Sequence, residues 1–177
     1  MIIKDVEVLF VAMNPESPLG SSEKDQSPYW IVIALARDKA EKTRLTEAGL
    51  NMLAVVPDED DPEDRDVKVN DGKMFWKCGI SRKEINQQGK TQKCPPVVDL
   101  SLNPVSPDTV GRGSICNVMV YLYENEKKPG KNVAVLMKLQ VVRHVVQEPM
   151  VNEEFEESTK TTEIVNAATM EEDKIEY

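Results

Sequence analysis

Hydrophobic and polar residues alternate along several short stretches of the chain, the pattern of β-strands that bury one face. Residues 2–11 place Val6, Val8 and Phe10 on one side of such a strand, alternating with Asp5, Glu7 and Leu9 on the other. Residues 115–124 alternate in the same way, with apolar side chains at the even positions from Cys116 to Leu122. Both stretches therefore predict strands that contribute one face to a core.

Further strands are predicted from apolar, β-branched runs that lie between turn-forming residues. They span residues 28–36, 51–56, 73–80, 97–102 and 133–146. The first of these runs, PYWIVIALA, suits a central strand buried on both faces. Residues 81–93 are polar and resemble a hairpin, and proline and glycine mark loops elsewhere.

One segment has the signals of a short amphipathic helix, at residues 38–48. Asp38 is a suitable N-cap, Glu41 follows at the third helical position, Leu45 lies on a narrow apolar stripe, and Gly49 suits the residue after the helix. The chain is thus predicted to be mainly β with one short helix. Five strands with Gly/Pro-rich turns favour an OB-fold-like, partly open, five-stranded barrel.

Charge divides the chain into two parts. The total formal charge is −9, but residues 148–177 alone carry −8, whereas residues 67–147 carry +7. A second acidic run lies at residues 58–66. We therefore expect a folded domain at residues 1–147 and a disordered acidic tail at residues 148–177.

Several classes of protein are disfavoured. The odd number of cysteines, three, and the lack of a secretory signal predict reduced thiols in a cytoplasm-like compartment. No apolar run approaches the roughly 20 residues that cross a bilayer, so we expect a soluble protein with no membrane contact.

The basic half carries the two kinds of group that bind single strands without sequence preference: cations for phosphates and exposed aromatic rings for bases. Phe75 lies between Lys73 and Lys77 in one strand, and Tyr121 and Tyr123 share a face of another. Other candidate DNA-binding cations lie in predicted loops and turns: Arg82, Lys90, Arg112, Lys128 and Lys131. The loop that carries Arg112 has the sequence GRGS and is predicted to be flexible.

Any single aromatic residue in a small β-domain more often packs in the core than stacks on a ligand. We assign Trp30 and Trp76 to the core for that reason. Tyr121 and Tyr123 differ, because the opposite face of their strand already supplies apolar residues to the core.

Enzymatic and metal-binding interpretations are weaker. Cys78, Cys94, Cys116 and His144 lack the short spacings of structural zinc sites. The acidic run at residues 58–66 could hold a divalent cation for nuclease chemistry, but such a block is usually a solvated loop. No nucleophile–base motif is present, so we expect no enzyme, metal or cofactor.

The acidic tail has two interpretations. It is either a solubilising end, or a mimic of a nucleic-acid strand that occupies the basic surface until DNA displaces it.

Taken in order, several segments resemble the single-stranded DNA-binding proteins of tailed phages, a replicative OB-fold family. They are PYWIVIALARDK, DGKMFWKC, PPVVDLS, GRGSICNVMVYLYEN and KKPGKNVAVLMKLQVVRHV, followed by an acidic tail that ends in Tyr177. The chain departs from the family at Asn117 and Met119, where relatives often carry lysines.

The resemblance implies a protein that coats single-stranded DNA in phage replication and recombination, in the cytoplasm of the infected host. It implies that the tail contacts the phage DNA polymerase and helicase/primase. The tail residues concerned are Glu171, Glu172, Asp173, Glu176 and Tyr177. A homodimer is compatible with the sequence. The alternative is a structural or assembly β-barrel protein of a virion.

Overall fold

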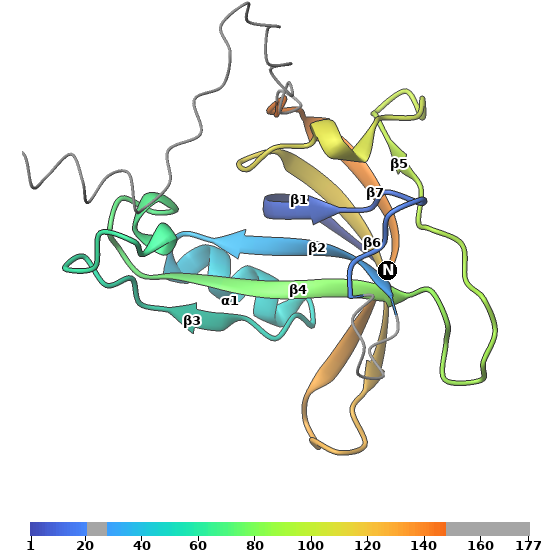
Figure 1. Ribbon diagram of the computed structural model, residues 1–177. Coiled ribbons are helices and arrows are strands. Elements are labelled where there is room, and N and C mark those ends of the chain that lie inside the picture. Colours follow the sequence, from blue (N-terminus) through green and yellow to red (C-terminus); the bar gives the residue numbers. More distant parts are fainter. Residues whose placement is uncertain (21–27, 148–177) are drawn as a thin grey trace, which may run out of the picture.

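The computed structural model describes residues 1–20 and 28–147, and the predicted tail lies outside that part of the chain. The elements follow one another as β1 (Ile2–Ala12), β2 (Tyr29–Ala36), α1 (Lys39–Glu47), β3 (Leu53–Val55), η1 (Arg65–Lys68), β4 (Phe75–Lys83), β5 (Val97–Val98), η2 (Pro107–Thr109), β6 (Ile115–Glu124) and β7 (Asn132–Arg143) (Figure 1). The helices of the described residues lack the length and apolar character of a membrane-spanning helix.

Five of the strands form a closed ring of pairings. β1 pairs with β2 and β6, β2 with β4, and β6 with β7, all antiparallel. The ring is completed by a parallel pairing of β4 with β7, whose one registered pair is Ser81 with Val135. This arrangement confirms a mainly β, OB-like fold with one α-helix, in which the β4–β7 contact is the narrowest join.

The short strands β3 and β5 extend the ring at β4 and β7. β5 is shorter than predicted, because residues 99–102 form a turn in which the Asp99 amide donates a hydrogen bond to the Asn103 carbonyl, with N···O 2.9 Å. β4 is longer than predicted and ends at Lys83, so its last three residues come from the segment expected to be a hairpin.

The core fills the inside of the ring. Val6 and Val8 on β1 and Val118 and Val120 on β6 point inward, as their alternation predicts. Burial of such side chains stabilises the fold by about 1.5–3 kcal/mol each. The assignment of both tryptophans to the core is confirmed, and Trp30 Nε1 donates a 2.9 Å hydrogen bond to a carbonyl of the β1–β2 loop.

The helix has the predicted caps. The Asp38 carboxylate accepts a 2.8 Å hydrogen bond from the Glu41 amide, Leu45 is fully buried, and Gly49 has φ +104°. A Cβ at Gly49 would lie 2.6 Å from a methyl of Leu122, so this close approach also requires glycine. Arg44 donates to two backbone carbonyls of β1 at 2.7 and 2.9 Å, which fixes α1 against the sheet.

The glycine loop at residues 111–114, which the sequence predicts to be flexible, makes hydrogen bonds to the segments on either side of it. The Gly111 amide donates to the Val145 carbonyl (2.8 Å), and the Gly113 amide donates to the Val8 carbonyl (2.9 Å). The buried Ser114 hydroxyl lies between the amide and carbonyl of Val145. The loop therefore links β1 to the residues that follow β7.

Candidate nucleic-acid interface

One row of cross-strand partners crosses the outward surface of all five ring strands. Its members are Ala12, Ile31, Ser81, Val135 and Tyr121, on β1, β2, β4, β7 and β6 in turn. Because partners in a sheet point to the same side, the row joins the exposed end of β6 to the open face of β2 and β4. OB-folds bind oligonucleotides on the face formed by the second and third strands of the barrel. In this ring, those two strands are β2 and β4.

Tyr121 and Tyr123 stand on this surface. Their side chains are 61% and 41% exposed, and their ring centroids lie 6.3 Å apart with planes inclined by 33°. The neighbouring Val120 is buried on the opposite face of β6. The prediction that these tyrosines point away from the core is therefore confirmed, and their contact with DNA stays a prediction.

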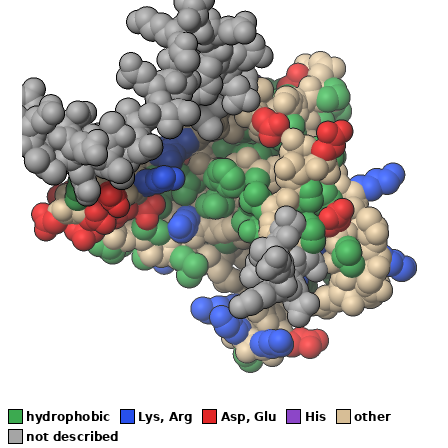
Figure 2. Space-filling view, in the orientation of Figure 1, with side chains coloured by type: hydrophobic (Ala, Val, Ile, Leu, Met, Phe, Trp, Pro, Cys, Tyr) green, Lys and Arg blue, Asp and Glu red, His purple; other side chains and the backbone are tan. Residues whose placement is uncertain are grey.

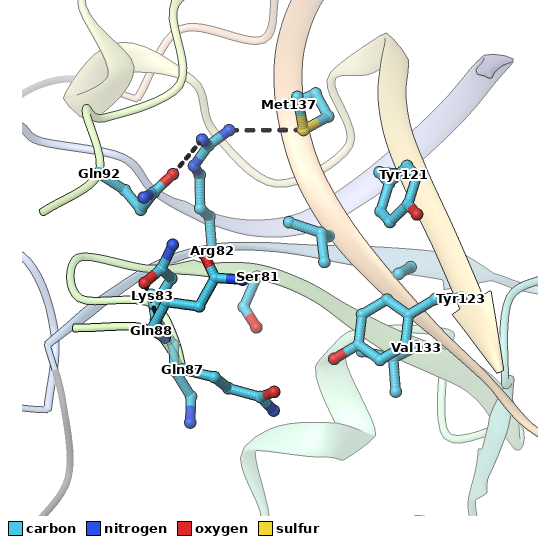
Figure 3. Close-up of a pocket in the computed structure, with 13 residues that line it drawn as sticks. Ser81, Arg82, Lys83, Gln87, Gln88, Gln92, Tyr121, Tyr123, Val133 and Met137 are labelled. Atoms are coloured by element: carbon cyan, nitrogen blue, oxygen red, sulfur yellow. Dashed lines mark hydrogen bonds between the residues drawn. The ribbon is translucent and has the colours of Figure 1, made fainter. Parts of the chain in front are cut away.

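Two cations lie across from the tyrosines, at the end of β4 (Figure 3). Arg82 Nη2 donates to Gln92 Oε1 at 2.7 Å, and its Nη1 lies 3.4 Å from Met137 Sδ. These contacts hold the guanidinium group beside β7. Lys83 follows it in the chain and is exposed.

A groove of about 490 Å³ lies between these groups. Its walls are the end of β4, the following loop, and the outward residues of β6 and β7. The lining residues are Ser81, Arg82, Lys83, Asn86, Gln87, Gln88, Gln92, Tyr121, Tyr123, Val133, Ala134, Val135 and Met137. They include two cationic groups, several carboxamide and hydroxyl side chains and no carboxylate, which suits a polyanion that carries hydrogen-bonding bases.

An apolar surface continues from the groove across β4, β2 and β1. Figure 2 shows hydrophobic side chains gathered in the middle of this face, with Lys and Arg side chains to their left and below them, and Asp and Glu side chains to their left and right. Ile31 and Ile33 on β2 are half-buried, and Gly79 on β4 is exposed. A Cβ at Gly79 would lie 3.1 Å from Ile31 Cδ1, so the Ile31 side chain packs closely against the glycine. The expectation that β2 is buried on both faces is therefore wrong for its first half.

Phe10 also belongs to this surface, contrary to the alternation that places it inside. The β1–β2 register shifts between Val8 and Phe10, and this β-bulge turns Phe10 outward, where its side chain is 47% exposed. Leu9, which lies between Val8 and Phe10 at the bulge, packs against a small cluster on the outer side of the ring. A one-residue slip moves every following side chain to the other face.

Phe75 has no exposed surface, so its prediction as a base-stacking residue is wrong. Its ring packs with Leu35 and Val69. Residues 65–72 fold over the start of β4 and supply Val69, which covers the face that the strand pattern alone leaves open.

The predicted cations fall into two groups. Arg82 lines the groove, while Lys90 lies on the loop that forms one wall, and the exposed Lys128 and Lys131 lie in the turn that joins β6 to β7. That turn is closed by the Asn125 amide, which donates to the Lys131 carbonyl with N···O 2.8 Å.

Lys73, Lys77 and Arg112 lie outside the groove. Lys73 precedes β4, and Lys77 lies four residues before Ser81 on that strand, about 13 Å away. Arg112 comes before the first residue of β6, and Tyr121 is six residues beyond that first residue, about 20 Å along the strand.

Several groups of the groove and the adjoining apolar surface could not be recognised in the sequence: Phe10, Ile31, Ile33 and the carboxamides of the β4–β5 loop. The polar composition of residues 81–93 was the available signal for the carboxamides.

Cysteines and acidic residues of the described part form no metal-binding cluster. Burial raises the pKa of the Cys116 thiol to about 12 and that of Cys94 to about 11, which keeps both protonated. His144 Nε2 lies 3.2 Å from the Thr109 hydroxyl. The zinc interpretation of these residues therefore finds no support in their arrangement.

The acidic run bonds to its own backbone. Asp64 accepts hydrogen bonds from the amides of Asp58 (2.7 Å) and Asp66 (2.8 Å), and these bonds lower the pKa of the Asp64 carboxyl. These carboxylates shape a solvated loop, as the sequence suggested, and their geometry gives no nuclease site.

The fold and the groove define an OB-like β-protein with a cationic, aromatic groove on its outward surface. No family model and no curated protein sequence matches the chain. Solved structures similar to it are single-stranded DNA-binding proteins of two bacteriophages.

The protein from bacteriophage Enc34 in complex with ssDNA is 15% identical, with 84% of this chain and 88% of that chain covered and a TM-score of 0.49. The gp2.5 protein of bacteriophage T7 is 11% identical, with coverages of 94% and 99% and a TM-score of 0.48. A C-terminal truncation of the Enc34 protein is 14% identical, with coverages of 84% and 86% and a TM-score of 0.45.

Proposed function

We propose that the protein binds single-stranded DNA without sequence preference and performs no chemistry on it. The observation that carries the proposal is the pair of exposed tyrosines, Tyr121 and Tyr123, facing Arg82 and Lys83 across a groove without carboxylates. Tyrosine rings stack on any base, and the two cations attract phosphates whatever the sequence.

The binding would use both the groove and the apolar face of β2 and β4. Bases stack on Tyr121 and Tyr123, and carboxamides such as Gln87 and Gln88 donate to base edges or phosphates. The turn lysines Lys128 and Lys131 and the loop residue Lys90 supply further long-range attraction.

Fluorescence anisotropy of a labelled oligothymidylate, measured over a salt series, tests the proposal. We expect affinity that falls steeply with salt. The double variant Tyr121→Ala/Tyr123→Ala should lose about 2–6 kcal/mol of binding free energy, the sum of two stacked bases, and keep its fold. The control is Leu53→Ala, which shortens an exposed apolar side chain of β3 outside the groove. Equal affinity for wild type and the double variant would exclude the stacking role.

We propose further that residues 148–177, with their charge of −8, compete with DNA for this surface. A tethered anionic segment has a high effective concentration at a cationic groove. Deleting residues 148–177 should therefore tighten DNA binding. A full-length variant with every tail Asp and Glu replaced by Asn and Gln separates charge from length, and should bind as tightly as the deletion.

When DNA displaces the tail, its end becomes free for replication proteins. Glu171, Glu172, Asp173, Glu176 and Tyr177 are the proposed contacts with a phage DNA polymerase and helicase/primase, in the cytoplasm of an infected host. Pull-down of those proteins by the chain should be stronger with DNA present, and Tyr177→Ala should abolish it. Sedimentation with and without the tail tests the proposed homodimer.

A further inference from the structure

A second, smaller depression of about 220 Å³ lies on the outward surface of β1, β6 and β7. Strand residues form its floor, and a turn after β5 forms one rim. The residues that line it are Ile2, Leu102, Asn117, Met119, Lys138 and Gln140. None of them is acidic, and one is a lysine.

The depression lies next to the groove along β6 and β7. Met119 and Tyr121 both point outward from β6, two residues and about 7 Å apart. On β7, Met137 lines the groove and Lys138 lines the depression. The β6–β7 register shifts between Met119 and Val120, which places both β7 residues beside the outward face of β6. A single path therefore runs from Tyr123 past Tyr121 to Met119.

The floor presents fixed polar groups. Asn117 Nδ2 donates to Gln140 Oε1 at 2.9 Å, and Asn117 Oδ1 accepts from the Asp5 amide at 3.1 Å. These bonds orient both carboxamides and leave Gln140 Nε2 to donate to a ligand. Within the described residues, the ion pairs are Arg37–Glu7 and Arg44–Glu41, so Lys138 is available to an anion.

Leu102 on the rim has an unusual conformation. Its φ is +64°, a region that glycine or asparagine adopts more readily, and its side chain is 63% exposed. The turn holds it there, because Asp99 Oδ1 accepts from the amides of Ser101 (2.8 Å) and Asn103 (2.9 Å). Strained backbone conformations of this kind gather at ligand sites.

We propose that this depression is a second nucleotide subsite on the same DNA path. A base lies against Met119 and Leu102, the Gln140 amide donates to it, and the adjoining phosphate pairs with Lys138. This inference rests on the proposed function, and it extends the path of the strand along β6 beyond the tyrosines.

The test measures binding of the full chain to oligothymidylates lengthened one nucleotide at a time. Leu102→Asn relieves the backbone strain, so it should melt at the same temperature as wild type or higher, yet lose affinity for the longer oligonucleotides. Lys138→Gln should lower affinity for those lengths by about fivefold at 0.1 M salt and reduce the salt slope by about 0.7. Both variants should bind the shortest oligonucleotides as wild type does, because these fill the groove alone.

The controls are Leu100→Asn, an exposed leucine beside the depression, and Lys39→Gln, an exposed lysine on α1. If Leu102→Asn and Lys138→Gln match these controls at every length while Tyr121→Ala weakens binding, the second subsite is wrong and the proposed function stands. If Tyr121→Ala also matches them, the proposed function fails as well. If Leu102→Asn changes the sedimenting mass and leaves DNA affinity unchanged, the depression is a contact between copies of the chain, which also overturns the subsite.

Discussion

Ser81 of β4 and Val135 of β7 are partners across the parallel join of the ring, and through them Ile31 of β2 and Tyr121 of β6 lie on one row. The strands β2 and β4 bear the apolar face, and β6 bears the tyrosines. The groove thus forms because β4 and the β6–β7 pair, which are distant in the sequence, meet where Ser81 pairs with Val135.

A charge placed in the middle of that row should control binding. Val135 is half-buried on the groove wall. Val135→Glu should weaken oligothymidylate binding by about tenfold or more, and Val135→Lys, of similar size, should keep or strengthen it. Anisotropy at low salt measures both. Equal affinities for the two variants would show that no phosphate passes this residue.

Phe75 and Phe10 should have opposite roles. Phe75→Ala removes a fully buried ring and should cost about 3–5 kcal/mol of unfolding free energy. Phe10→Ala removes a half-exposed ring and should cost far less stability, but it should lose about 1–3 kcal/mol of DNA binding if a base stacks there. Urea unfolding and anisotropy on the same two proteins separate these effects. A binding defect in folded Phe75→Ala without one in Phe10→Ala would reverse the assignment.

The glycine loop should be intolerant of side chains at Gly111. A Cβ there would lie 2.8 Å from the Val145 carbonyl oxygen, so Gly111→Ala must move backbone and should destabilise the fold by about 1–3 kcal/mol. Gly89 has φ +76°, but no atom lies within 4 Å of the position that a Cβ would take there. Gly89→Ala should therefore cost only the smaller backbone penalty of about 1 kcal/mol. Thermal unfolding distinguishes the two, and similar losses at both sites would mean that the loop adjusts freely.

Stability should fall in alkaline solution because of the buried thiols. Burial raises the pKa of Cys116 from 9.0 to about 12. Below pH 9 the thiol is neutral in both states and has no effect. Above pH 9 it ionises only in the unfolded chain, so unfolding becomes easier, by about 1.4 kcal/mol at pH 10, until the folded thiol also ionises near pH 12.

Urea unfolding of wild type and Cys116→Ala between pH 7.5 and 10 isolates this contribution. We expect Cys116→Ala to be less stable than wild type at pH 7.5. Between pH 7.5 and 10, its free energy of unfolding should fall by about 1.4 kcal/mol less than that of wild type. If the free energies of unfolding of the two proteins fall in parallel as the pH rises, the Cys116 thiol is in contact with solvent.

Much of the fold follows from local pattern. Alternation predicted β1 and β6 because one face of each is buried, an apolar run predicted β7, and the Asp38 and Gly49 caps predicted α1. The outward direction of Tyr121 and Tyr123 followed from the same alternation. These features depend on residues that are close in the sequence, so one amino-acid sequence is enough to predict them.

What the pattern could not show depends on contacts between distant segments. The bulge that turns Phe10 outward breaks the alternation without any change of composition. The burial of Phe75 needs Val69, which reaches it only when residues 65–72 fold over β4. The position of Arg82 opposite the tyrosines needs the β4–β7 register, which no local signal encodes.

The pairing of Ser81 with Val135 also determines at which step of folding the groove forms. The walls of the groove come from β4 and its loop, from β6, and from β7, the last strand of the ring. A chain still emerging from the ribosome holds the apolar face but not the groove, so it gains affinity for a ligand only at the final step of folding. By mass action, a ligand that occupies the finished groove in turn opposes the loss of β7. If the proposed function holds, a bound DNA strand therefore stabilises the closed ring of strands.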